Sequence, residues 1–222
     1  MKMFLAGSTG AVGTLFLPLA EAAGHVVVPH VRPQSAAKTL LSAHPYACVA
    51  DLAHTHVIAA AMGGVETVVV LVGTTRARFS AGDSYASSDV GAVLDLVRAG
   101  AAAAVRRVVL LSSLGAGGPG AYLAAKAEAE QIVQQSGLAW VIARPGAFSQ
   151  EAESPTGLHG RRQFSGAATA VFGTLESLGL RRFAHRYGPM PLSDLAAGLL
   201  RAAEGGHDGC ILHGDKLRAR AE

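Results

Sequence analysis

The sequence predicts an α/β fold in which helices cover both faces of a doubly wound parallel sheet. Short β-branched runs alternate along the chain with longer stretches rich in Ala and Leu, a rhythm typical of parallel strands joined by helical crossovers. The runs at 68–72 and 108–111 are continuously apolar, as in strands that are buried on both faces. With 222 residues, 50% of them hydrophobic, the chain can bury the core of one such domain.

The expected elements follow one another in strand-helix order. The predicted strands are 3–6, 26–31, 47–49, 67–72, 108–113 and 139–143, and the predicted helices are 11–23, 35–43, 89–101, 122–136 and 194–204. Gly24 and Gly137 stand just past two helical stretches, where a left-handed C-cap is needed. Ser193 is expected to cap the last helix. Because proline donates nothing to a strand ladder, we expect the second strand to be short or irregular around Pro29.

The C-terminal third is less regular. From about residue 151 to residue 189, Gly, Ser, His and Arg are mixed without a clear period. We therefore expect a single domain over 1–222, in which 151–222 contribute a small substrate-side lid.

Charge and hydropathy exclude several function classes. The formal net charge is only +3 and the basic residues are dispersed, whereas a dedicated nucleic-acid binder shows a concentrated basic footprint. The apolar runs are far shorter than the roughly 20 residues that cross a bilayer. The N-terminal apolar run breaks into glycines after Ala6, unlike a signal peptide. We expect a cytoplasmic protein, a monomer or a homodimer, that acts on a small molecule and binds neither nucleic acid nor membrane.

Cysteine and histidine spacing gives no sign of a metal site. Cys48 and Cys210 lie far apart and lack the spacing of a disulfide framework or a zinc site, which favours a reducing compartment. His54 and His56 flank Thr55, but no third ligand with suitable spacing lies nearby. We predict no metal.

A glycine-rich turn directly follows the first predicted strand. Residues 7–13 read Gly-Ser-Thr-Gly-Ala-Val-Gly and open a helix. Glycines at this place allow a tight turn and let a pyrophosphate approach the helix N-terminus. The preceding strand and the following helix are the context that the motif requires. The turn therefore predicts a dinucleotide site, with an ordinary strand-to-helix turn as the alternative.

The end of the second strand bears on which dinucleotide binds. An Asp or Glu about 20 residues after the glycines would hold the ribose 2′-hydroxyl of NAD, whereas an Arg accommodates the 2′-phosphate of NADP. No acidic residue lies between Ala22 and Ala50, and Arg32 occupies the region. We predict NADP(H) over NAD(H), the alternative being a solvated surface arginine.

Two further strand ends fall where doubly wound sheets bind ligands. Asp51 and Leu52 follow the third strand, and Val72, Gly73 and Thr74 follow the fourth. Asp51 is placed to reach the adenine, and Gly73 lets the chain pass the cofactor ribose. A helix cap and a turn are the respective alternatives.

A candidate catalytic set follows the fifth strand. Ser113 ends that strand, and Tyr122 and Lys126 stand four residues apart at the start of the next helix, on one helix face. A tyrosine with an ordinary pKa of about 10 needs a nearby ammonium to stabilise its phenolate. Tyr122 would transfer the proton that accompanies hydride transfer, while Ser113 binds the substrate oxygen. The alternative is a partly buried Tyr beside a solvated Lys.

These segments resemble the short-chain dehydrogenase/reductase superfamily, in the atypical NAD(P)-binding branch that includes NmrA-like proteins and Tat-interacting-protein-like oxidoreductases. The likeness runs through 7–13, 72–76, 110–116, 122–130, 143–148 and 186–196, and so spans nearly the whole chain. Two departures from the family pattern are a short, glycine-rich loop at 114–121 and the absence of a recognisable motif in 151–187.

The resemblance implies a Rossmann-type fold and a set of site residues. Pyrophosphate would be held by Gly7, Ser8, Thr9, Gly10, Ala11, Val12 and Gly13. Arg32 would hold the 2′-phosphate, and the nicotinamide would be lined by Pro145, Gly146, Ala147 and Phe148. Ser113, Tyr122 and Lys126 would form the catalytic set.

The function expected on these grounds is an NADPH-dependent oxidoreductase that transfers hydride to a small carbonyl or quinone substrate. One alternative is a non-catalytic NADP(H)-sensing regulatory protein that acts through a protein partner. A second alternative is a nucleotide-sugar epimerase or dehydratase with bound NAD, although the lack of an acidic residue after the second strand counts against NAD.

Overall fold

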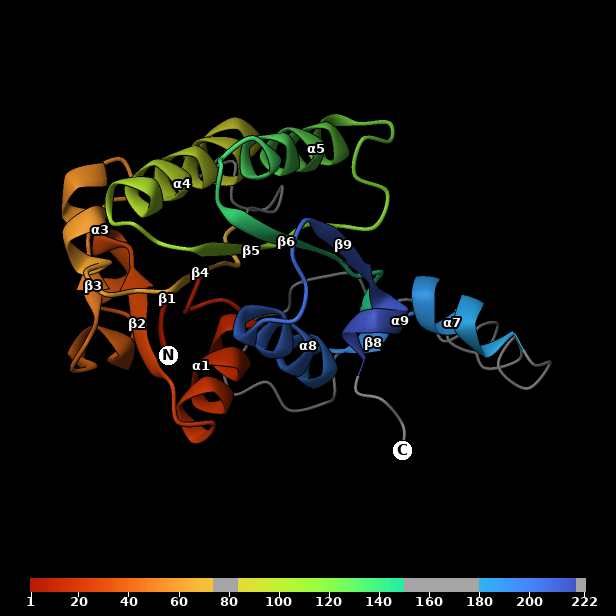
Figure 1. Cartoon of the computed structure of the whole chain (residues 1–222), viewed down its shortest axis with the longest axis horizontal. Coiled ribbons are helices and arrows are strands. Elements are labelled where there is room, and N and C mark those ends of the chain that lie inside the picture. Colours follow the sequence, from red (N-terminus) through yellow and green to blue (C-terminus); the bar gives the residue numbers. More distant parts are fainter. Residues whose placement is uncertain (74–83, 150–179, 219–222) are drawn as a thin grey trace.

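The computed structural model describes residues 1–73, 84–149 and 180–218 (Figure 1). Within these ranges, parallel strands form a seven-stranded sheet in the order β3-β2-β1-β4-β5-β6-β9. The strands are β1 (Lys2–Ala6), β2 (Val26–Val31), β3 (Cys48–Val49), β4 (Thr67–Val70), β5 (Arg107–Leu111), β6 (Ala139–Arg144) and β9 (Cys210–His213). β2 and β3 are added on one side of β1, whereas β4, β5, β6 and β9 are added on its other side. The doubly wound α/β fold is thus confirmed, with its topological switch point between β1 and β4.

The remaining elements connect these strands. The helical segments are α1 (Gly13–Ala22), α2 (Pro33–Ala36), η1 (Leu40–Ala43), α3 (Thr55–Ala61), η3 (Ala86–Gly91), α4 (Ala92–Ala102), α5 (Ala121–Gln134), α7 (Arg181–Tyr187), α8 (Leu192–Glu204) and α9 (Gly214–Leu217). Two short strands, β7 (Phe148–Ser149) and β8 (Met190–Pro191), pair in parallel beside the main sheet.

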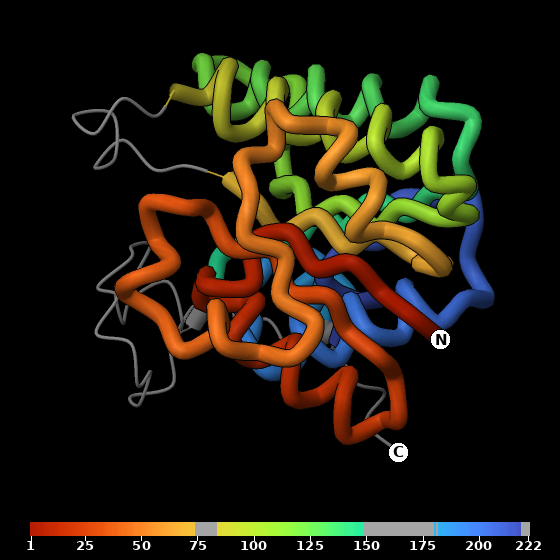
Figure 2. The backbone as a smooth tube through the Cα atoms, turned by 90° about the vertical axis from the view of Figure 1, so that its left-hand side faces the viewer, coloured from red at the N-terminus to blue at the C-terminus, as the bar shows by residue number. Residues whose placement is uncertain are grey.

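Helices cover both faces of the sheet, as predicted. Figure 1 shows α3, α4 and α5 on one face and α1 and α8 on the other, and Figure 2 shows the same layers from the side. Successive residues of β1 divide between the two layers: Phe4 packs under α3, α4 and α5, whereas Met3 and Leu5 pack against α1 and α8. All three side chains are completely buried, which explains why the strands read as uninterrupted apolar runs.

Proline 29 does not disturb its strand, so the expected irregularity is wrong. β2 runs unbroken from Val26 to Val31, and Pro29 pairs with Leu5 of β1. On its other side, β2 meets β3 only at His30 and Val31. The edge of β2 that lacks a neighbour at Pro29 accommodates a residue without an N–H.

Two helix predictions are also corrected. The expected helix over 35–43 is divided into α2 and η1, because Thr39 has extended backbone and its hydroxyl accepts a hydrogen bond from the Leu41 N–H, which starts a new turn. Ser193 does not cap the last helix: α8 begins at Leu192, directly after β8. Gly24 and Gly137 adopt φ angles of +82° and +76°, which confirms the left-handed positions predicted for them.

The C-terminal segment contributes to the domain itself. One face of α8 is buried in the layer shared with α1, and β9 extends the sheet beside β6. These elements belong to the core of the domain, and residues 150–179 of the segment expected to form a lid lie outside the described ranges. In the part of the chain that the structure describes, none of the helices combines the length and hydropathy that a membrane span requires.

Candidate functional site at the carboxyl edge of the sheet

In the turn after β1, the backbone at Gly7 lies close to the backbone at Leu71, and the backbone at Gly13 lies close to that of Gly7. Gly7 has a φ of +92°, and a Cβ there would lie 2.8 Å from the Leu71 carbonyl carbon. A Cβ on Gly13 would lie 2.2 Å from the Gly7 oxygen. Val12, at the N-cap of α1, makes no side-chain hydrogen bond to the first turn, and the N–H groups of Thr14 and Leu15 bond to the carbonyls of Gly10 and Val12 at 3.0 and 3.1 Å. This arrangement fits a pyrophosphate at a helix N-terminus.

Two residues of the turn use their side chains for the fold. Ser8 is fully buried, and its hydroxyl donates a 2.6 Å hydrogen bond to the His30 carbonyl, which ties the turn to β2. Val12 is buried in the core layer with α8. Only the backbone of these two residues is available to a ligand.

A cavity of about 480 Å³ lies at the switch point, within the size range of small-molecule and cofactor sites. It brings together eight of the predicted cofactor residues: Gly7, Thr9, Gly10, Arg32, Asp51, Leu52, Val72 and Gly73. Ser8, Ala11, Val12 and Gly13 are not among the lining residues, and Thr74 lies outside the described residues. We call this space the switch-point cavity.

Sequence reasoning missed several residues that line the switch-point cavity: His30, Gln34, Ala53, Leu71, Ser87, Ser88, Gly91, Ala92 and Asp95. Five of them come from η3 and the start of α4, the segment that follows the fourth strand. The position of that segment after a strand end was the available signal, but no motif marks its residues.

Charged and polar groups gather at the β2 end of the cavity, where Arg32 offers a guanidinium that suits a phosphate. Burial raises the pKa of the Asp95 carboxyl, an effect that Arg98 opposes and Asp51 reinforces. Burial also lowers the pKa of His30. Its Nε2 lies 2.9 Å from the Ala50 carbonyl oxygen, and because a carbonyl only accepts, Nε2 carries the ring proton.

Lys126 is held by an acidic residue that the sequence analysis did not identify. Its ammonium lies 2.7 Å from the Asp89 carboxylate, with side chains 8% and 1% exposed. The ammonium is also 5.8 Å from the centroid of the Tyr122 ring, which in turn packs against Tyr85. Lys126 therefore lies beside Tyr122 as the spacing predicts, but its charge is balanced by Asp89, which sits on a π-helical turn.

Gly73 connects this pair with the switch-point cavity. A Cβ on Gly73 would lie 3.2 Å from Asp89 Oδ1 and 3.3 Å from Lys126 Nζ. Ser113, Tyr122 and Lys126 are not among the residues that line the cavity. Gly73 therefore lies between the cavity, which it lines, and the Lys126–Asp89 pair, which it contacts.

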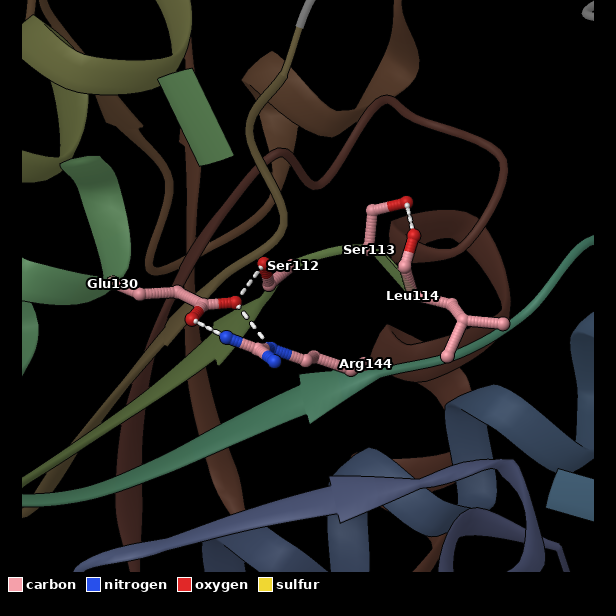
Figure 3. Close-up of polar contacts among 5 residues, drawn as sticks. All are labelled: Ser112, Ser113, Leu114, Glu130 and Arg144. Atoms are coloured by element: carbon pink, nitrogen blue, oxygen red, sulfur yellow. Dashed lines mark hydrogen bonds and ion pairs between the residues drawn. The ribbon is translucent and has the colours of Figure 1, made fainter. Parts of the chain in front are cut away.

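The two serines at the end of β5 differ in their surroundings. Figure 3 shows Ser112 pointing toward Glu130 and Ser113 pointing away from it. The buried Ser112 hydroxyl donates to Glu130, which also accepts hydrogen bonds of 2.8 and 2.5 Å from Arg144. These bonds raise the pKa of the Arg144 guanidinium. Among the described residues, the half-buried Ser113 hydroxyl makes a long 3.3 Å contact with the adjacent Leu114 carbonyl, so it can turn to another acceptor or donor.

Residues 145–148 connect the loop after β5 with the C-terminal elements. The Pro145 carbonyl accepts from the Leu114 N–H at 2.8 Å, and the Ala147 carbonyl accepts from the Met190 N–H at 3.0 Å. Phe148 packs against the core layer of α1 and α8. None of residues 145–148 lines the switch-point cavity.

A family model for NAD(P)H-binding proteins matches residues 7–171. A search of curated proteins gave no significant match.

Solved structures with the same fold include a Bacillus halodurans protein assigned as an NAD-dependent epimerase/dehydratase, with 21% identity over 97% of this chain and 95% of that chain and a TM-score of 0.68. An Escherichia coli O157:H7 anaerobillin reductase shares 21% identity over 93% and 92%, with a TM-score of 0.64. An Escherichia coli NADPH-dependent quinone oxidoreductase in complex with NADPH shares 18% identity over 96% and 68%, also with a TM-score of 0.64.

Proposed function

Since this chain belongs to the NAD(P)H-binding family, we propose that it is an NADPH-dependent oxidoreductase of the atypical short-chain dehydrogenase/reductase type, acting on a small carbonyl or quinone. The observation that carries the proposal is the contact of the switch-point cavity with the Tyr122 helix. The cavity ends at Gly73, and Lys126 of that helix lies against Gly73. A dinucleotide that lies along the cavity would bring its reactive end toward Tyr122.

The chain's own residues suggest how the cofactor is held. The glycine turn that leads into α1 would bind the pyrophosphate, and Arg32 would bind a 2′-phosphate. When bound, NADPH supplies the hydride for reduction. The preference for NADP(H) over NAD(H) rests on Arg32 and on the lack of an acidic residue between Ala22 and Ala50.

In the proposed reaction, Tyr122 gives its phenolic proton to the substrate oxygen as hydride reaches the carbonyl carbon. Ser113 donates a hydrogen bond to the same oxygen. Lys126, held by Asp89, keeps a cation beside the Tyr122 ring without leaving a bare buried charge. The names of two solved structures, a quinone oxidoreductase and an anaerobillin reductase, favour reduction of a conjugated acceptor.

The test is NADPH oxidation, followed by the absorbance of the reduced nicotinamide, with a panel of quinones, aldehydes and ketones. NADH is run in parallel, and Tyr122→Phe serves as the matched variant because it removes one hydroxyl. We expect Tyr122→Phe to lose turnover and to keep its affinity for NADPH. Equal turnover by Tyr122→Phe would overturn the mechanism.

The Lys126–Asp89 ion pair favours one other candidate, an NADP(H)-sensing protein without turnover. An ammonium whose charge is balanced by a buried carboxylate stabilises a phenolate less than a free one does. In that case NADPH would bind, no substrate of the panel would be reduced, and a protein partner would bind differently to the NADP and NADPH forms.

A further inference from the structure

A second cavity, of about 720 Å³, lies between α7 and α9, and the proposed reaction does not use it. Of the residues that the structure describes, four basic side chains line it, Arg182, His185, Arg186 and Lys216, together with one carboxylate, Asp215. Three of the basic groups are permanently charged near neutral pH. The α7–α9 cavity therefore carries an excess of positive charge.

One of these cations presents a buried hydrogen-bond donor that is not used. Nε of Arg186 has no hydrogen-bond partner among the described residues, although the atom is buried. A buried donor without an acceptor is unfavourable, so such a group needs a ligand or an ordered water. A carboxylate or phosphate oxygen matches the planar guanidinium, which binds oxyanions through two parallel N–H groups.

The charge in this region also acts on a neighbouring histidine. Burial is the first cause that lowers the pKa of His213, and the positive charges of Arg186 and Arg144 are the next two. Asp215 and Glu130 oppose the shift but do not cancel it. Glu130 is already bonded to Arg144, and the remaining acidic group, Asp215, lines the cavity with one buried oxygen that has no hydrogen-bond partner among the described residues. One carboxylate faces Arg182, Arg186 and Lys216, so the basic side chains still outnumber it.

Aromatic rings stand next to these cations. The Arg186 guanidinium lies 5.7 Å from the centroid of the Tyr187 ring. Phe183, which is 52% exposed, lies 4.8 Å from the same ring, centroid to centroid. An exposed Phe183 ring and a half-buried Tyr187 ring beside a cation suit a flat, unsaturated group that carries an anionic substituent.

The walls of the α7–α9 cavity are fixed to the domain. A Cβ on Gly214 would lie 2.5 Å from the His185 carbonyl oxygen, so α9 approaches the end of α7 only because this residue is glycine. The Arg218 guanidinium donates to the carbonyls of His185 and Pro189. Figure 1 shows α7 and α9 side by side beyond the ends of β6 and β9.

The position of the cavity separates it from the switch-point cavity. Residues of β3 and β2 lie at one side of the sheet, whereas β6 and β9 form the other. A Cβ on Gly146 would lie 2.9 Å from the Tyr187 carbonyl oxygen, so the α7–α9 cavity borders the segment expected to line the nicotinamide. An anion bound here would belong to the hydride acceptor, since the phosphates of the cofactor are expected at the glycine turn.

We propose that the α7–α9 cavity binds an oxyanion group, carboxylate or phosphate, on an aromatic or conjugated substrate. Arg186 is the central donor, Arg182 and Lys216 add charge, and the Tyr187 and Phe183 rings contact the unsaturated body. The assignment as a substrate site rests on the proposed oxidoreductase function, but the existence of an oxyanion site does not.

The test compares ligands that share a ring and differ in charge. Benzoate, phenyl phosphate and neutral benzamide are titrated into the full chain by isothermal titration calorimetry, with and without saturating NADPH. The variants are Arg186→Gln and Lys216→Gln, and Arg106→Gln is the control because Arg106 is exposed at the opposite end of β5. The thermal unfolding midpoint of each variant shows whether it is folded.

Binding of benzoate or phenyl phosphate should exceed that of benzamide by about tenfold or more, the loss expected for one charged hydrogen bond. Arg186→Gln should lose this difference, Lys216→Gln should reduce it, and Arg106→Gln should keep it. Equal binding of benzamide and benzoate, or an unchanged affinity in a folded Arg186→Gln, would overturn the proposal. NADPH affinity is measured in the same samples. If the protein binds benzoate or phenyl phosphate but not NADPH, the proposed function is contradicted and the oxyanion site is still supported.

Discussion

The Lys126 ammonium lies 2.7 Å from the Asp89 carboxylate, and both groups are almost wholly withdrawn from solvent. The pair joins α5 to the turn before α4 next to Gly73, at the end of the switch-point cavity. Taking one partner from a buried ion pair leaves the other charge uncompensated, which costs far more than removing both. The pair therefore serves stability as well as the placement of Lys126.

Asp89→Asn should lower the free energy of unfolding by about 3–5 kcal/mol, because the Lys126 ammonium stays buried without a counter-charge. The double variant Asp89→Asn with Lys126→Met should recover part of this loss, since it removes the remaining charge. Urea unfolding followed by circular dichroism measures both. If Asp89→Asn unfolds at the wild-type urea concentration, the ion pair does not hold α5 and η3 together.

Glu130→Gln should destabilise the protein by about 2–4 kcal/mol, because Glu130 is buried and accepts from both Ser112 and Arg144. Glu128 is the matched control, since it stands on the same helix with an exposed side chain. Glu128→Gln should change the stability by less than about 0.5 kcal/mol. Equal unfolding midpoints for the two variants would contradict the role of Glu130 in joining α5 to the ends of β5 and β6.

The layered sheet, the glycine turn and the Tyr122–Lys126 helix face could be predicted from the sequence, because local patterns determine them. The continuous apolar strands require two helical layers, and the glycines at 7–13 leave the turn against Leu71 open. The four-residue spacing puts Tyr122 and Lys126 on one face of α5. Each of these features follows from neighbours along the chain.

Other features depend on residues that are distant in sequence. Asp89 becomes the partner of Lys126 only when η3 packs on α5, and no spacing rule connects positions so far apart. Helix α3 was not expected over Thr55–Ala61, where β-branched residues disfavour a helix, and the complete burial of Ile58 stabilises it. The four residues of β9 are recognisable as a strand only through their pairing with β6.

Stability should fall as the solution is acidified below about pH 6.5, the ordinary pKa of histidine. Burial lowers the pKa of His30 in the folded protein, so between its folded pKa and about 6.5 the unfolded chain binds more protons. The free energy of unfolding therefore rises with pH through this window and falls on acidification. The pKa of His213 is also lowered and acts in the same direction.

His30→Gln isolates the contribution of His30 to this pH dependence. The glutamine amide can keep the hydrogen bond to the Ala50 carbonyl but does not titrate. Unfolding midpoints measured from pH 5 to pH 8 should show a shallower acid loss in His30→Gln than in the wild type. An identical slope in both proteins would mean that His30 keeps its ordinary pKa when folded.

Arg32→Ala should weaken NADPH binding by about tenfold or more and leave NADH binding within about twofold. The guanidinium lies at the β2 end of the switch-point cavity, where a 2′-phosphate would accept charged hydrogen bonds that a 2′-hydroxyl cannot replace. Lys38→Ala is the control, because Lys38 is the next basic residue along the chain and its side chain is exposed. Fluorescence titration with each reduced cofactor measures the affinities. An equal loss for NADPH and NADH in Arg32→Ala would show that Arg32 contacts the shared part of the two cofactors, and the preference for NADP(H) would then need another cause.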